Sequence, residues 1–593
     1  MNGGFDILEN AWATVLVLLF FGGSIFVHEL GHFLAAKWRG LKITRFSIGF
    51  GPILFSWKGR DGCEYAVSLL PLGGYVALPQ LAEMGAIEGT DASDSAGLPK
   101  ISCFDKIIVS AAGAFFNIIA AAVLAVVVWI FGLPVSSSEA TTTIGYVAKT
   151  ISGADGKTVQ SPADKCGLKA GDEIVAIDSV KVSDFSQVIE RIAIGSGRTA
   201  DGAPSAEIEI LRDGRPQKIT VLPELITTNT AAGDVIRMIG IYPAATMKIG
   251  KIMPDSPAAR AGLEVGDIVA GIDGKKLFSN MQLSDILSAV PLGSPVNLEI
   301  LRGGEKRTIK IVPEKVALTK PLCKITLPAD AGTVSFVAAA PKSADNSETV
   351  RVLAVNADGF GGGKIAAGDI LYEIAMKKVD SLSQLNAIIN TTVGSSGARM
   401  YFSDDSMNLK SAYLPPNSKS EILPPQEKMM LGYYLENIVI VRHPSIAEQF
   451  SDSIERTYAA IASLANPRSD VGFASLAGPV DIGRVIYRLS LTDISLMLSF
   501  AVLLNINLAI LNMLPIPVLD GGHILFAVIE RVRGKALPRS FFVAVQSIFS
   551  LAFIGLMAYV VYLGFLRWNG DAQSESAAEK ISQYYVENIT FKK

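Results

Sequence analysis

Four long apolar segments, at about 11–36, 107–133, 494–514 and 541–566, constrain this chain more than any other feature of its sequence. Each has the ~20 residues that a helix needs to cross a hydrocarbon layer of ~30 Å. Because water does not reach the backbone in that layer, a spanning segment must satisfy its own hydrogen bonds, which predicts an α-helix. Half of the residues are hydrophobic and 18% are charged, which indicates a membrane protein with a large water-exposed part.

The distribution of basic residues sets the expected orientation of these segments. Lys and Arg gather in the loop after the first segment and in the loop between the third and fourth. The positive-inside rule places both loops in the cytoplasm, so both chain ends and the stretch from about 134 to 490 are expected outside. The net charge of −3 gives no argument for a nucleic-acid partner.

The first apolar segment carries the sequence His28-Glu29-Leu30-Gly31-His32 near its C-terminal end. Two histidines four residues apart share one face of a helix, and with the glutamate between them they are typical of a zinc site with an activated water. An ionisable group at bilayer depth costs roughly 2.5–3.5 kcal/mol, which favours a functional role for the motif. A helix-packing cluster or a degenerate site is the alternative.

A third ligand is expected just beyond the third apolar segment, because segments one and three run in the same direction and end at the same face. Asn512-Met-Leu-Pro515-Ile-Pro517-Val-Leu-Asp520 follows there, and its prolines end the helix. Asp520 would complete a set of two histidines and one carboxylate, which leaves a fourth position for water. His523, three residues further on, competes for the same role.

Residues 37–103 do not have the pattern of a plain loop. Weakly alternating apolar runs around Gly49-Phe50-Gly51 and Pro71-Leu-Gly-Gly-Tyr75 predict β-hairpins with glycine-rich corners. Their apolar content indicates an element that dips into the membrane and offers a strand edge to an extended substrate beside the metal. A small cytoplasmic hairpin domain is the alternative. Residues 77–100 are expected to form a mobile loop.

The outer part contains an internal repeat. Ser-Pro-Ala precedes a Gly-Leu…Gly-Asp segment twice, at 167–178 and 262–273, and a looser third copy lies at 365–374. The Gly-Asp turn and the alternating residues after it predict a half-buried strand. These repeats look like PDZ domains, whose default role is to bind an extended peptide or chain end. Spacers or steric walls without a ligand are the alternative. The three units are expected at 140–222, 236–315 and 325–425.

The four cysteines show no Cys-x-x-Cys spacing, so they predict neither a zinc cluster nor a dense disulfide framework. Whether Cys166 and Cys323 pair in an oxidising compartment or stay separate is left open. The remaining regions are expected as follows: a first transmembrane helix with the histidine motif at 1–36, a cytoplasmic loop with the β element at 37–103, a second transmembrane helix at 104–133, an amphipathic helical region at 440–488, a third transmembrane helix with the Asp motif and a cytoplasmic loop at 489–540, a fourth transmembrane helix at 541–566, and a tail at 567–593.

The histidine motif in segment one, the paired PDZ-like repeats and the Asn512-x-x-Pro515-x-Pro517-x-x-Asp520 motif after segment three resemble the site-2 protease family of intramembrane zinc metalloproteases. Within this family the chain is similar to the bacterial regulator-of-sigma-E protease type, over most of its length. The resemblance implies one zinc ion bound by His28, His32 and Asp520, with Glu29 as general base. It implies a multi-pass protein of four transmembrane helices with a membrane-associated β-hairpin element and extracytoplasmic PDZ-like domains.

The resemblance also implies residues that bind the substrate. These are Asn512 and Pro515 of the third-segment motif, Gly49, Phe50 and Gly51 of the β element, and Asn117 of the second segment. The chain departs from the family pattern in two places. It has Gly113-Ala114 where Gly-Pro often precedes the asparagine, and its third PDZ-like unit exceeds the usual two.

The function that the resemblance implies is hydrolysis of peptide bonds within the transmembrane segments of single-span proteins of the bacterial inner membrane, with the zinc site near the cytoplasmic side. The substrate would be a protein already trimmed by another protease, such as an anti-sigma factor, or a remnant signal peptide. The PDZ-like array favours a trimmed substrate, because it can exclude bulky outer domains. A catalytically inert PDZ-containing scaffold or regulator is the alternative. A transporter is disfavoured, because four segments offer no repeated helical halves.

Overall fold

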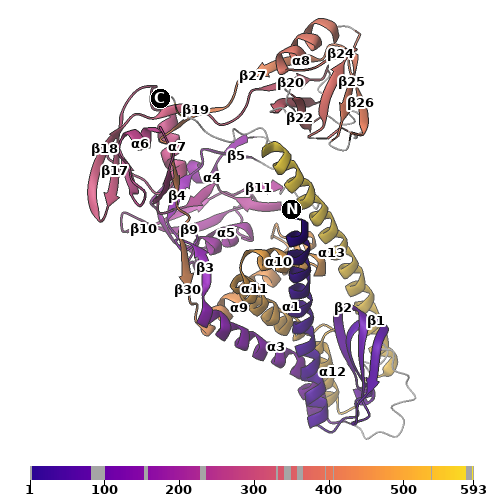
Figure 1. Ribbon diagram of the computed structural model, residues 1–593. Helices are drawn as coiled ribbons and strands as arrows, with labels where there is room; N and C mark the ends of the chain where they lie inside the picture. The colour runs from indigo at the N-terminus through magenta and orange to yellow at the C-terminus, as the bar shows by residue number, and fades with distance from the viewer. Residues whose placement is uncertain are drawn as a thin grey trace.

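The structure is a computed structural model, and it separates into a helical part and a β-rich part (Figure 1). The loop expected at 77–100 lies outside the described residues from 82 onward. The described residues are 3–81, 101–152, 158–227, 235–328, 332–339, 349–356, 365–366, 368–393, 396–404, 407–535, 537–582 and 591.

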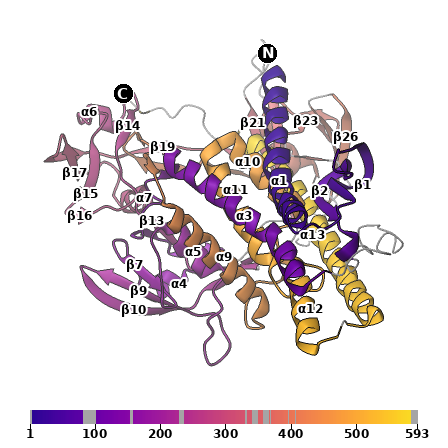
Figure 2. The same ribbon diagram turned by 90° about the horizontal axis from the view of Figure 1, so that it is seen from below.

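Four helices of the described residues are long and apolar enough to cross a membrane, as the sequence predicts. The second of them, α3, packs against α1, α11 and α12 and is the centre of the helical part. Figure 2 shows α3 and α11 running next to each other. The four helices are α1 (Gly3–Trp38), α3 (Cys103–Phe131), α11 (Ile494–Asn512) and α13 (Arg539–Ser582).

Three further helices complete the helical part. One of them, α10, holds α13 in place through a buried ion pair in which Nη1 of Arg567 donates to Asp481 at 2.8 Å. Both side chains are less than a tenth exposed, so α13 is fixed by a charge pair as well as by apolar packing. The three helices are α9 (Ile446–Ala465), α10 (Pro479–Thr492) and α12 (Asp520–Arg533).

The strands β1 (Arg45–Lys58) and β2 (Glu64–Ala77) form a hairpin that folds over on itself beside the C-terminal half of α1 (Figure 1). The first residues of β1 pair with both ends of β2 and therefore lie between them. The bend in β1 falls at Gly49 and Gly51, whose φ angles of +89° and +85° favour glycine. The expected β element is therefore present next to the helix that carries the histidine motif.

The β-rich part consists of three units, each with its own hydrophobic core. In each unit the Gly-Asp turn places a buried aspartate against a basic side chain of the sheet, which explains why the turn recurs. These pairs are Asp172–Arg212, Asp267–Arg302 and Asp369–Lys410, with N–O distances of 2.7, 2.7 and 2.9 Å.

The first and second units have the same plan, and each contains its own four-stranded sheet and one longer helix. The first unit contains β7 (Glu173–Ile177), β8 (Val180–Lys181), α5 (Phe185–Ala193), β9 (Ala206–Arg212) and β10 (Arg215–Val221), in the sheet order β10-β9-β7-β8. The second unit contains β15 (Ile268–Ile272), β16 (Lys275–Lys276), α7 (Asn280–Ser288), β17 (Val296–Arg302) and β18 (Glu305–Ile311), in the sheet order β16-β15-β17-β18.

The third unit is built on a larger sheet, in the order β26-β25-β23-β22-β21-β20-β27, with β24 paired to β23. Its elements are β20 (Leu322–Thr326), β21 (Thr333–Ala339), β22 (Thr349–Asn356), β23 (Ile370–Ile374), β24 (Lys377–Lys378), α8 (Leu382–Ile388), β25 (Ala398–Ser403), β26 (Leu409–Leu414) and β27 (Lys419–Leu423).

The third unit is inserted into a hairpin of the second. β19 (Glu314–Ala317) pairs antiparallel with β28 (Glu427–Met430), and the whole third unit lies between them in the chain. The next strand, β29 (Tyr433–Leu435), returns to pair with β14 (Ile249–Ile252) of the second unit. The second unit therefore includes strands from both sides of the third.

The first unit has the same hairpin without an insertion. β11 (Glu224–Thr227) pairs with β12 (Val235–Met238), and only residues 228–234 separate them. Two linkers join the first two units to the helical part and run side by side, because β3 (Leu133–Ser136) pairs with β30 (Val439–Arg442).

The four cysteines are free thiols. Cys166 lies in the first unit and Cys323 in the core of the third, where burial raises the pKa of its thiol to about 12. Of the two options left open by the sequence, the structure contains the separate thiols.

We expect that the third unit can be excised without unfolding the second. Replacing residues 318–426 by a short Gly-Ser turn leaves β19 and β28 adjacent, and each doubling of loop length changes the closure cost by only about 0.6 kcal/mol. Hydrogen exchange of the β14 amides in the purified variant should remain slow. Deleting β17 and β18 instead should make the β14 amides exchange fast, and equally fast exchange in the excision variant would contradict the insertion.

Candidate metal centre

The two histidines of α1 face each other across one helical turn. Their Nε2 atoms lie 3.1 Å apart. Nδ1 of His32 lies 2.7 Å from the carbonyl oxygen of Val109 on α3. Because a carbonyl oxygen only accepts, this nitrogen carries the ring proton, and the Nε2 lone pair of His32 faces His28. The contact with α3 thus sets the tautomer that a metal ligand requires.

Asp520 begins α12 and reaches the same point. Its Oδ2 lies 3.2 Å from Nε2 of His28 and 3.4 Å from Nε2 of His32. The side chains of His28 and Asp520 are 11% exposed and that of His32 is 8% exposed. The convergence that the sequence predicts from the directions of the first and third spans is therefore present in the structure.

The turn between α11 and α12 needs two glycines to bring Asp520 to this position. A Cβ atom on Gly521 would lie 2.3 Å from the carbonyl oxygen of Met513, and one on Gly522 would lie 2.2 Å from that of Ile516. No side chain fits at these distances, so Asp-Gly-Gly is the local sequence that lets the chain fold back under the start of α12.

The three ligand atoms fit a zinc ion. Their separations of 3.1–3.4 Å match the ~3.3 Å edge of a tetrahedron with metal–ligand bonds of 2.0–2.1 Å. Oδ2 of Asp520 is buried and makes no hydrogen bond, although Nε2 of His28 and Nε2 of His32 lie 3.2 and 3.4 Å away. A metal cation between the three atoms would satisfy this buried carboxylate oxygen. His28, His32 and Asp520 form the only such ligand group found among the described residues.

Gly113 on α3 provides the space between the ligands. A Cβ atom there would lie 2.4 Å from Nε2 of His32 and 2.8 Å from Nε2 of His28. Any other residue would fill the space between the two imidazole rings. In the sequence, Gly113-Ala114 is only a departure from the family pattern, and its role depends on a contact between two helices that no local pattern reveals.

Two asparagines contact His28. Nδ2 of Asn117 lies 3.2 Å from its Nδ1, and Nδ2 of Asn512 lies 3.3 Å from its Nε2. Asn117 is fully buried and its Oδ1 has no partner. Turning this amide by 180° makes Oδ1 the acceptor of the Nδ1 proton of His28. Both histidines then have the same tautomer, and a metal bound at their Nε2 atoms would take the lone pair of His28 that the amide of Asn512 faces.

Glu29 lies against the β hairpin and close to the ligands. A Cβ atom on Gly74 would lie 2.8 Å from Cγ of Glu29, so β2 passes in direct contact with this acid. A cavity of about 10 Å³ is lined by Glu29, His32 and Asp520, among others, which is about the room of one water molecule. An acid, the ligand atoms and a space for water therefore occur together.

The other residues predicted to bind substrate or metal lie at different distances from this site. Gly49, Phe50 and Gly51 lie at the bend of β1, whereas the hairpin residue that contacts Glu29 is Gly74, which the sequence did not single out individually. Pro515 lies in the turn before α12. Of the two candidate third ligands, Asp520 joins the histidines, and the ring of His523 packs against Phe542 at a centroid distance of 6.2 Å.

Residues 16–556 match the model of peptidase family M50. The chain belongs to this family. A putative zinc metalloprotease of Vibrio cholerae is 25% identical over 565 residues, covering 95% of this chain and 99% of its own. The regulator of sigma-E protease RseP of Escherichia coli is 24% identical over 565 residues, covering 93% and 99%. The regulator of sigma E protease of Haemophilus influenzae is 23% identical over 563 residues, covering 94% and 99%. The family, the enzyme class and the zinc cofactor expected from the sequence are confirmed.

We expect Gly113→Ala to remove zinc from the purified protein, because the new methyl group occupies the space between the two histidines. Metal analysis of the purified variant measures this loss. Gly23→Ala on α1 is the matched control, since its Cβ atom meets nothing within 4 Å, and it should keep the metal. Equal zinc contents in the two variants would show that Gly113 is not at the ion.

We expect Asn117→Ala to weaken zinc binding by roughly 10–100-fold, the usual effect of losing the partner that orients a histidine ligand. Asn117→Asp keeps an oxygen acceptor for Nδ1 of His28 and should retain most of the affinity. Competition with a chelator measures both. If Asn117→Asp weakened zinc binding as much as Asn117→Ala does, the proposed role of Asn117 as a hydrogen-bond acceptor would be wrong.

Proposed function

We propose that this protein is an intramembrane endopeptidase in which His28, His32 and Asp520 hold one zinc ion and Glu29 is the general base. The convergence of the three ligand atoms, at the end of a membrane-spanning helix and beside an acid, supports this assignment. Zinc at such a site lowers the pKa of a water molecule toward ~7 and polarises the substrate carbonyl.

Glu29 takes the proton from the attacking water and passes it to the leaving amine. Its contact with Gly74 keeps the carboxylate between β2 and the two histidines. The amide of Asn512, next to His28, is placed to donate to the backbone of the substrate. These roles assign one proton carrier and one positioning group to the chain itself.

The substrate is held as an added strand along β2. In the described part of the chain, residues 74–77 of β2 pair with residues 45–48 of β1, and their opposite edge pairs with no strand. A transmembrane helix hides its carbonyls in internal hydrogen bonds, so it must unwind before cleavage. Strand addition at this edge, next to Glu29, compensates the unwound backbone with new hydrogen bonds.

The hairpin dips into the lipid. The outer half of β1 exposes Ile53, Leu54, Phe55 and Trp57, with 42–64% of each residue accessible. Such a run is unfavourable in water and suits a lipid-facing edge. Together with the basic loops at this end of the helices, it supports a zinc site near the cytoplasmic side and PDZ-like units on the periplasmic side of a bacterial inner membrane.

The substrates are single-span membrane proteins whose outer domain another protease has already removed, with anti-sigma factors and remnant signal peptides as the candidate classes. The names of the relatives from Escherichia coli and Haemophilus influenzae, which describe regulators of sigma E, favour the first class. The PDZ-like units lie between the periplasm and the membrane helices. They either bind the new chain end of the substrate or exclude substrates with bulky outer domains.

We expect Glu29→Gln to keep zinc and the fold while cleavage of a model single-span substrate falls by at least about 10²-fold, because the amide cannot take the proton. The measurement compares the metal content and the cleavage rate of the purified variant with those of the unmodified protein. A variant that cleaves at the full rate would end the general-base assignment. An inert scaffold would instead leave the unmodified protein without activity.

A further inference from the structure

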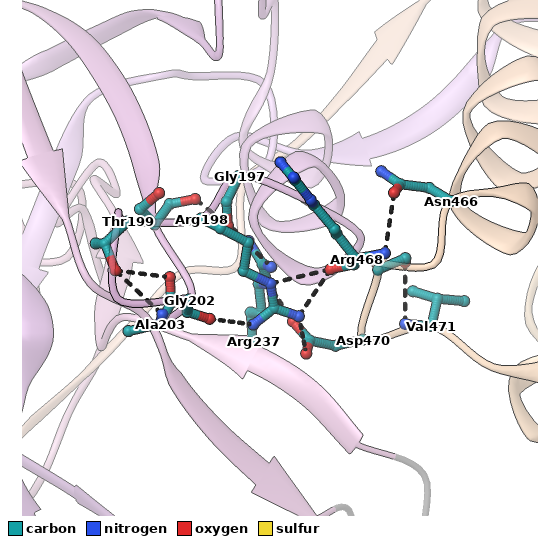
Figure 3. Close-up of polar contacts among 12 residues, drawn as sticks. Gly197, Arg198, Thr199, Gly202, Ala203, Arg237, Asn466, Arg468, Asp470 and Val471 are labelled. Carbon is teal, nitrogen blue, oxygen red and sulfur yellow. Dashed lines mark hydrogen bonds and ion pairs between the residues drawn. The ribbon is translucent and has the colours of Figure 1, made fainter.

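One carboxylate of the helical part is held by two arginines of the first β-rich unit (Figure 3). Asp470 lies in the segment after α9. Its Oδ1 accepts a hydrogen bond from Arg198 at 2.5 Å and its Oδ2 accepts one from Nε of Arg237 at 2.8 Å. The side chain of Arg237 is completely buried, and those of Asp470 and Arg198 are 13% and 19% exposed. This is therefore a largely desolvated contact.

Among the described residues of the first unit, no acidic side chain pairs with the buried arginine. The remaining donors of Arg237 bond the carbonyl oxygens of Gly197 and Ser205 within the same unit, at 3.2 and 3.3 Å. Carbonyl groups satisfy its hydrogen bonds but not its charge. Asp470 is the acid that neutralises this arginine in the described part of the chain, so docking on the helical part pairs the buried charge.

Arg198 also donates hydrogen bonds to the backbone of the segment that contains Asp470. Nε and Nη2 of Arg198 donate to the carbonyl oxygen of Arg468 at 3.0 and 2.8 Å. The segment is therefore held at a side chain and at a main-chain carbonyl by one planar guanidinium group, which fixes its orientation.

The other ion pairs that the described residues make between the first unit and its surroundings are more exposed. Arg442 of β30 lies 3.6 Å from Asp184, with side-chain exposures of 36% and 16%. Arg191 bonds Glu455 at 2.8 Å, but the side chain of Glu455 is 60% exposed. Arg456 lies 3.4 Å from Glu190, with side-chain exposures of 44% and 32%. Water screens such pairs, and they contribute little. Asp470 is thus the ionic contact on which the docking of the first unit depends.

The docked unit is connected to the helix that leads to the metal centre. α9, which precedes Asp470, packs against α11 and α3. Gln449 of α9 donates to the carbonyl oxygen of Ala125 at 3.0 Å in a buried contact, and Thr457 bonds Asn507 of α11. In Figures 1 and 2, helix α5 of the first unit lies next to α9.

We propose that Asp470 is a specificity-determining residue. It locks the first β-rich unit over the ends of the membrane helices, so that only substrates with a short outer stub reach the metal centre. The proposal rests on the proposed function and assigns its substrate selection to one contact. Loss of the carboxylate leaves Arg237 buried with an unpaired charge, and the unit must move away from the helices to hydrate it.

The test uses the full-length protein in lipid vesicles and two versions of one single-span substrate, one with a short outer stub and one with a folded outer domain. For Asp470→Asn we expect about the same rate on the stub substrate and about a tenfold or larger rise on the domain-bearing substrate, because removal of one partner of a buried ion pair is strongly disruptive. Asp470→Glu keeps the charge and should still discriminate. Glu455→Gln, at an exposed pair of the same interface, should change neither rate.

The outcomes separate this proposal from the proposed function. If the unmodified protein cleaves the stub substrate and Asp470→Asn still refuses the domain-bearing one, the lock is overturned while the protease assignment stands. If the unmodified protein cleaves neither, the protease assignment fails. Hydrogen exchange supplies a second readout, in which amides of β12 and of residues 466–471 should exchange faster in Asp470→Asn while those of β9 stay protected. Should β9 lose protection, Arg198→Gln replaces Asp470→Asn as the test variant. It removes the hydrogen bonds of Arg198 to Asp470 and to the carbonyl oxygen of Arg468 and leaves Arg237 paired. A smaller rise on the domain-bearing substrate is expected, and a larger rise than in Asp470→Asn would overturn the role given to the buried charge of Arg237.

Discussion

The close approach of α1 to α3 is the contact on which the metal centre depends. A Cβ atom on Gly31 would lie 2.4 Å from the carbonyl oxygen of Ala112, so the two backbones touch at this level. Only at this distance does the carbonyl of Val109 reach His32, and only with Gly113 opposite does space for an ion remain. In lipid, where apolar surface gains little from association, small residues and polar contacts of this kind hold helices together.

Polar side chains of the helical part lower the cost of their burial by hydrogen bonding to one another across helices. Nδ2 of Asn505 on α11 bonds Ser24 of α1 at 2.9 Å, one turn above the histidine motif. Asn117 and Asn512 bracket His28 from α3 and α11. Each of the three central helices therefore contributes polar groups to one cluster, and removing one member leaves a neighbour unsatisfied in an environment without water.

The sequence predicted those features whose signals are local or periodic. The spans follow from apolar length, the pairing of His28 with His32 follows from the helical period, and the arrival of Asp520 follows from the directions of the spans. It did not reveal the roles of Gly74 and Gly113, because a glycine needed for a contact between two elements has no pattern of its own.

The insertion was missed for a related reason. Repeated turns identify units but do not show which distant strands pair, and β19 finds β28 only across the whole third unit. Asp470 is similar, since a single aspartate in a connecting segment becomes informative only when the two arginines around it are seen.

The hairpin that receives the third unit has a consequence for how such proteins diversify. Because the two strands leave and re-enter the second unit next to each other, a module of any length can be gained or lost there without changing the sheet on either side. Differences in length between family members should then collect at this one junction, while the helices around the ion keep a constant spacing. The β-rich part and the helical part of the molecule are in this sense free to evolve at separate rates.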